Sequence, residues 1–162
     1  MTEPARTVLV FLASALALQV PFVAQVDEGC AAASLAMVFG YWERPASEEE
    51  VRNALFEPQL HGILGSRLAA FARAHDMTAF AYRGDLEQLR ESIDKGRPVI
   101  VAWRMRRNRY HDVVVVGVDM ERRQVLVNDP AEGPLRRVPQ QRFEERWAGA
   151  GHWALLMVPA DP

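Results

Sequence analysis

The stretch CAAASLAMVF, residues 30–39, organises the chain, because a segment this apolar must be covered on nearly every side. It is rich in alanine and carries no charge, and Gly40, a common helix stop, follows it. A helix that is apolar all round is typical of a core position. We therefore predict a buried central helix with Cys30 in its first turn, and we expect later elements to cover it.

Apolar periodicity predicts which elements those are. Helical spacing predicts further helices at residues 47–55, 65–74, 85–95 and 140–147. Short apolar runs predict strands at residues 77–82, 99–103, 111–118, 124–127 and 152–158. Helices come first and strands dominate later, so we expect an α+β fold in which N-terminal helices pack on a mostly antiparallel sheet.

Composition excludes several classes of function. A chain of 162 residues suits one domain, and a net charge of −2 gives no footprint for nucleic acid. The single cysteine excludes an internal disulfide and zinc sites built on cysteine pairs. The spacing of His61, His75 and His152 fits no metal motif. We therefore expect no metal and no cofactor.

The amino terminus carries a separate signal. The run TVLVFLASALA, residues 7–17, follows Arg6 and ends in small residues, as a secretory signal does. A buried first strand is the alternative, but we favour a signal peptide or membrane anchor at residues 1–19 and a folded domain at residues 20–162. The protein would then be periplasmic, secreted or membrane-associated, although a cytoplasmic location stays open.

Cys30 is the first candidate for chemistry. Free backbone N–H groups at a helix start favour a thiolate, which is the nucleophilic form of cysteine. His111 opens a valine strand, and a hairpin with the next strand would bring it beside Asp129. A carboxylate there could hold the imidazole in place as a base for the thiol. Gln25, shortly before the helix, is either an oxyanion donor or a solvated loop residue.

Three segments together resemble a known family. VPFVAQVDEGCAAASLAMVFGYW, residues 20–42, resembles the opening motif of the C39 peptidases, papain-like enzymes that process bacteriocin precursors. YHDVVVVGVD, residues 110–119, is similar to the family's His-Tyr-Val-Val-Val segment, and VNDPAEG, residues 127–133, to its Asp-Pro segment. The resemblance covers roughly residues 20–158 with the motifs in family order. It implies a papain-like fold.

The resemblance also implies roles for single residues. Cys30 matches the nucleophile, His111 the general base, Asp129 the residue that orients the base, and Gln25 the oxyanion-hole glutamine. It implies a cysteine peptidase that cuts peptide substrates, in the family after a Gly-Gly pair of a leader peptide. Such domains are often fused to an ABC transporter, and no phosphate-binding loop of the form GxxxxGK[ST] occurs here, so a free-standing peptidase with a separate transporter partner is expected.

One departure from the family keeps two other functions open. The family has Gly-Pro after the cysteine, whereas Ala31 and Ala32 stand here. Alanine keeps the backbone N–H groups and suits a helix start. A papain-like acyltransferase and a catalytically silent peptide-binding domain nevertheless remain alternatives to the peptidase.

Overall fold

The computed structural model describes residues 17–106 and 108–161. The predicted signal or anchor lies largely in residues 1–16, outside the described residues. Leu18, at the end of that predicted segment, donates a backbone hydrogen bond to Val116 O at 2.8 Å and packs against the core. No helix in the described part of the chain has the length and apolar character needed to cross a membrane.

The helices form where the sequence predicts them. They are α1 (Cys30–Tyr41), α2 (Glu48–Leu55), the 3-10 turn η1 (Pro58–Leu60), α3 (Gly65–Ala74), α4 (Leu86–Asp94) and α5 (Gln140–Ala148). Ser47 and Glu50 make a capping box at the start of α2. The expected stop at Gly40 is wrong, because α1 continues to Tyr41. Gly40 instead allows a close approach, since a Cβ there would lie 2.9 Å from Pro21 Cγ.

The strands form one sheet. They are β1 (Met77–Arg83), β2 (Val99–Arg104), β3 (Tyr110–Asp119), β4 (Gln124–Asp129), β5 (Gly133–Pro139) and β6 (Trp153–Pro159). Their order is β1-β6-β2-β3-β4-β5, and every neighbouring pair is antiparallel. The sequence analysis missed β5, whose polar and proline-containing sequence GPLRRVP gives no strand pattern. Pairing of β5 with the edge of β4 makes it a strand.

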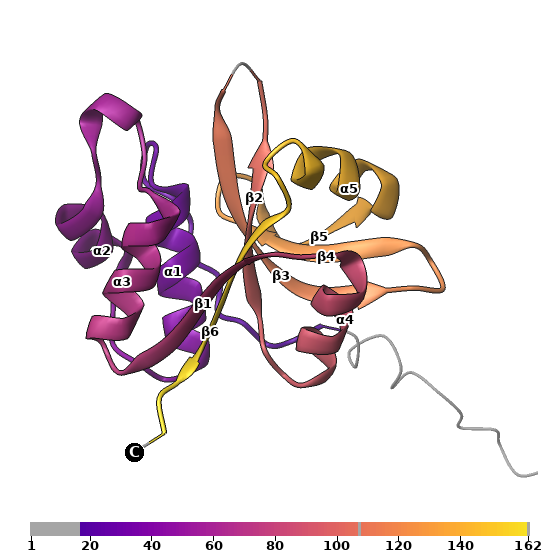
Figure 1. Cartoon of the computed structure of the whole chain (residues 1–162), viewed down its shortest axis with the longest axis horizontal. Helices are drawn as coiled ribbons and strands as arrows, with labels where there is room; N and C mark the ends of the chain where they lie inside the picture. The colour runs from indigo at the N-terminus through magenta and orange to yellow at the C-terminus, as the bar shows by residue number, and fades with distance from the viewer. Residues whose placement is uncertain (1–16, 107, 162) are drawn as a thin grey trace, which may run out of the picture.

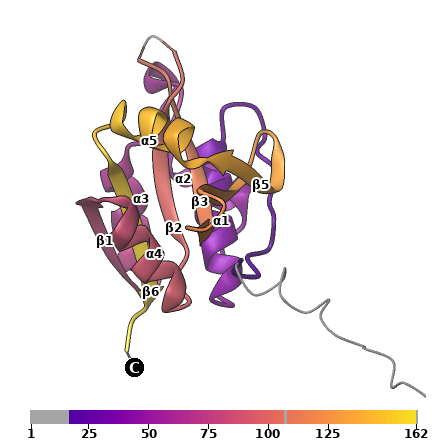
Figure 2. The same ribbon diagram turned by 90° about the vertical axis from the view of Figure 1, so that its right-hand side faces the viewer.

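Helices cover the sheet on both faces (Figure 1). α1, α2 and α3 lie on one face, whereas α4 and α5 lie on the other, which Figure 2 turns toward the viewer. Alternate valines of β3 serve the two cores: Val114 and Val116 belong to the core beneath α1, and Val113 and Val115 to the core beneath α4 and α5. This alternation explains the unbroken valine run.

Candidate active site

Cys30 is the first residue of α1 and is half-buried. The chain turns sharply before it, because Gly29 N donates to Val26 O at 2.9 Å and a Cβ on Gly29 would lie only 2.8 Å from that oxygen. The first intrahelical hydrogen bond runs from Ala33 N to Gly29 O. The N–H groups of Cys30 and the two alanines after it therefore have no helical partner and favour negative charge near the sulfur.

His111 and Asp129 meet at one end of the sheet. His111 Nε2 donates to Asp129 Oδ1 at 2.7 Å, across the β3–β4 hairpin that the sequence predicts. The two side chains are 12% and 6% exposed, and the ring of buried Trp103 lies 6.5 Å from the imidazole, centroid to centroid. Asp129 Oδ1 also accepts from Ala131 N at 2.9 Å, which fixes the carboxylate. Because Nε2 is engaged, Nδ1 is the nitrogen left for the thiol.

The charges at this end of the sheet favour an ion pair. Burial disfavours an imidazolium at His111, but hydrogen bonds to Asp129 and Cys30 and the negative charge of both outweigh it, so the pKa of His111 rises to about 10. Burial likewise disfavours the charged form of Asp129, yet the His111 hydrogen bond and charge hold the pKa of that carboxyl below its usual range. The arrangement can therefore keep His111 protonated near neutral pH, where it can act as a proton donor.

Gln25 lies on the same side of the site. Its backbone N–H donates to Pro130 O at 2.9 Å, so it is tied to the turn that follows Asp129. Its Nε2 donates to Asp27 O at 2.6 Å, which leaves the second amide hydrogen unused. Its Oε1 is buried without a partner within residues 17–106 and 108–161. A side-chain donor is thus held near the cysteine.

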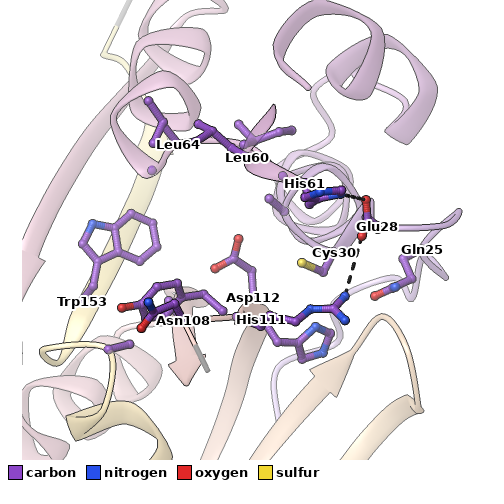
Figure 3. A pocket seen from close by; sticks show the side chains of 18 of the residues that line it. Gln25, Glu28, Cys30, Leu60, His61, Leu64, Asn108, His111, Asp112 and Trp153 are labelled. Carbon is purple, nitrogen blue, oxygen red and sulfur yellow. Dashed lines mark hydrogen bonds and ion pairs between the residues drawn. The ribbon is translucent and has the colours of Figure 1, made fainter. Parts of the chain in front are cut away.

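A cavity of about 870 Å³ brings three of the four predicted residues together. Gln25, Cys30 and His111 line it, whereas Asp129 lies behind His111 and lines a smaller cavity of about 410 Å³. Figure 3 shows Cys30 and His111 on the floor of the larger cavity, with Leu60, Leu64 and Trp153 among the residues around it. Its size suits an extended peptide segment rather than a single small ion.

Sequence reasoning missed two further features of this cavity. Glu28 lies 3.1 Å from His61 Nδ1 and 3.7 Å from Arg109 Nη2, so one carboxylate joins three segments at the cavity wall (Figure 3). Asp112, next to His111, also lines the cavity. The sequence offered one signal for Asp112, namely an acidic residue at the start of a valine strand. The pairing of Glu28 with His61 had no signal in the sequence.

The histidines and acids of the described chain do not gather into a metal site, since no group of three or more His, Cys, Asp or Glu side chains that could hold a metal ion occurs there. Arg104 ends β2, and Arg109, just before β3, lines the larger cavity.

This chain is similar to known proteins along most of its length. Residues 17–155 match the Peptidase_C39 like family. The chain is 30% identical over 141 residues to the "Transport/processing ATP-binding protein ComA" of Streptococcus pneumoniae, which covers 86% of this chain but only 18% of that protein. This chain therefore spans less than a fifth of the length of that curated relative.

Two solved structures are similar along nearly their whole length. One is a double glycine motif protease from an AMS/PCAT transporter in complex with the leader peptide, with 28% identity, a TM-score of 0.73, and coverage of 91% of this chain and 96% of that one. The other is the peptidase domain of Streptococcus ComA, with 23% identity, a TM-score of 0.72, and coverage of 85% and 97%. The second supports the fold alone, and it agrees with the predicted α+β, papain-like architecture.

Proposed function

The chain belongs to the Peptidase_C39 like family, and from this membership we propose that it is a cysteine peptidase that cleaves a leader-type peptide after a Gly-Gly pair. The observation that carries the proposal is the His111–Asp129 hydrogen bond of 2.7 Å beside a thiol at a helix N-terminus. Imidazole, carboxylate and thiol then have the relative order that a papain-like nucleophile requires.

The first half of the reaction uses the ion pair. The Cys30 thiolate attacks the scissile carbonyl carbon, and the carbonyl oxygen becomes an oxyanion. The Cys30 N–H and the unused Gln25 Nε2 hydrogen donate to that oxyanion. When the C–N bond breaks, the His111 imidazolium gives its proton to the leaving amine, and a thioester on Cys30 remains.

The second half regenerates the enzyme. His111, now neutral, takes a proton from water as the water oxygen attacks the thioester carbon. The carboxylic acid leaves and the sulfur departs as thiolate, which restores the starting pair. Asp129 holds Nε2 throughout, so Nδ1 keeps facing the reacting atoms.

The alanines after Cys30 are compatible with this chemistry. Ala31 is 3% exposed and Ala32 is fully buried, and both lie in a regular first turn of α1. The backbone N–H of Cys30 thus stays available to an oxyanion although Gly-Pro is absent. This geometry favours the peptidase over a silent binding domain.

The relatives support a substrate class and a partner. The solved double glycine motif protease was crystallised with a leader peptide, and the curated relative is named a transport/processing protein. We propose that this chain likewise acts on a leader-bearing peptide that an ABC transporter exports.

The proposal is tested with a synthetic leader peptide that contains one Gly-Gly pair. The wild type should cleave after the pair, as read by mass spectrometry, and Cys30→Ala and His111→Ala should each lower kcat/KM by about 10⁴-fold or more. His75→Ala is the matched control, because His75 is exposed and lies outside the cavity. Full activity of Cys30→Ala would overturn the proposal. An added primary amine separates the two reactions, since an acyltransferase would yield mainly the amide and a peptidase mainly the carboxylic acid.

A further inference from the structure

Asp112 lies on the opposite face of β3 from His111. His111 shares its face with Val113 and Val115, whereas Asp112 shares the face of Val114 and Val116, which α1 covers. Asp112 therefore lies on the face of the sheet against which α1, the helix that begins at Cys30, packs.

A hydrogen bond between α1 and β3 fixes Asp112 near Cys30. Ser34 Oγ donates to the backbone oxygen of Asp112 at 3.2 Å, and Ser34 is fully buried. Ser34 follows Cys30 by four residues, so the two occupy the same side of the helix. The contact brings Asp112 under the helix end from which the thiol projects.

The Asp112 carboxylate points into the large cavity, between Cys30 and Trp153 (Figure 3). Across residues 17–106 and 108–161 it makes neither a hydrogen bond nor an ion pair. Burial raises the pKa of Asp112 to about 6, and the nearby His111 charge opposes that rise. At pH 7.5 this half-buried group is mainly a carboxylate, so a cation that enters the cavity can pair with it.

The surroundings leave room for that partner. The residue opposite Asp112 on β2 is Ala102, whose small side chain also lines the cavity. Leu64 and Trp153 provide apolar walls along which a methylene chain can lie. Arg109, at the cavity wall, lies 3.7 Å from Glu28 instead.

We propose that Asp112 is a specificity residue whose carboxylate receives the lysine or arginine side chain of a bound peptide. The inference rests on the proposed function for the identity of the substrate as a peptide. A Gly-Gly pair has no side chains, so the cation belongs to a residue outside the pair. Apolar walls hold its stem and the carboxylate pairs with its charged end.

The test uses pairs of peptides that differ only in the terminal ammonium group of one side chain. One peptide of each pair carries lysine and the other carries norleucine at the same position. Four positions are tested in turn: the third and fourth residues before the cut, and the first and second residues after it. At one of these positions the wild type should prefer lysine by about 10- to 100-fold in kcat/KM, mainly through KM. Asp112→Asn should lower kcat/KM for the lysine peptide far more than for the norleucine peptide, and so remove the preference.

Asp76→Asn is the matched control, because it makes the same change at an exposed aspartate outside the cavity and should keep the preference. An equal loss on both peptides in Asp112→Asn would make Asp112 a positioning residue for His111 and overturn the proposal. A wild type with no preference at any position overturns it as well. That second result needs no variant, so it holds even where Asp112→Asn fails to fold.

Binding measurements distinguish a failure of this proposal from a failure of the proposed function. The peptides are titrated onto Cys30→Ala by calorimetry, which needs no cleavage. Tighter binding of the lysine peptide by about tenfold, lost in Cys30→Ala/Asp112→Asn, supports Asp112 even where the wild type cuts nothing. Equal affinity of the two peptides, or no binding of either, overturns the role of Asp112 even where cleavage succeeds.

Discussion

The Asp129→Asn substitution tests what holds the charge on His111. It keeps an oxygen acceptor of the same shape 2.7 Å from Nε2 but removes the negative charge. A hydrogen bond to a charged group contributes about 1 to 2 kcal/mol more than a neutral one. At about 1.4 kcal/mol per pH unit, the pKa of His111 should fall by about one unit from its value of about 10.

The pKa of His111 can be measured directly. The chain has four histidines, so ¹³C-histidine NMR with His111→Ala for assignment follows the single titration against pH. The alkaline limb of kcat/KM should move down with it, because His111 must be protonated to release the leaving amine. Asp119→Asn is the control, since Asp119 lies at the other end of β3 and pairs with Arg122.

Stability gives a second measure of the same charge. The folded pKa of His111 lies above the ordinary value of 6.5, so its contribution to the free energy of unfolding is complete below pH 6.5 and is lost as pH rises toward 10. Asp129→Asn should show a smaller loss over this range in urea titrations. A His111 midpoint that stays near 10 in Asp129→Asn would refute the reasoning, since the carboxylate would then not hold the imidazolium.

Three other substitutions test the packing around the site. Leu35→Ala should lower the free energy of unfolding by about 2 to 5 kcal/mol, because Leu35 is fully buried in α1, and an unchanged urea midpoint would contradict this. Ser47→Ala should lower it by about 1 kcal/mol through loss of the α2 cap, with kcat/KM unchanged. Gly65→Ala should displace Trp153 from the cavity wall, since a Cβ would lie 2.5 Å from Trp153 Cζ2. The KM of this variant should rise and its tryptophan fluorescence spectrum should shift. An unchanged KM and an unchanged spectrum would show that Trp153 stays in place and would contradict the prediction.

Local sequence patterns predicted most of the helices and strands, and they predicted that two residues of the site, His111 and Asp129, lie close together. The apolar run before Gly40 predicted α1, and the valine run predicted a strand; both predictions are confirmed. The proximity of His111 and Asp129 followed from a hairpin, which is a local structure whose register depends on one short turn.

What stayed beyond the sequence depends on contacts between distant segments. No local rule places α1 on one face of the sheet, so Cys30 could not be brought to His111 by spacing alone. The same uncertainty hid Asp112, because its direction has meaning only once the face that α1 covers is known. β5 was missed since pairing with β4, and not its own residues, makes it a strand.

The hydrogen bond from Ser34 to β3 has a consequence during synthesis. The helix with the thiol leaves the ribosome before the strands that carry the imidazole and the carboxylate. Until the chain has extended past Asp129 and the helix has docked, the sulfur has no base beside it. In the proposed mechanism, a nascent or half-folded chain therefore lacks the base that activates Cys30.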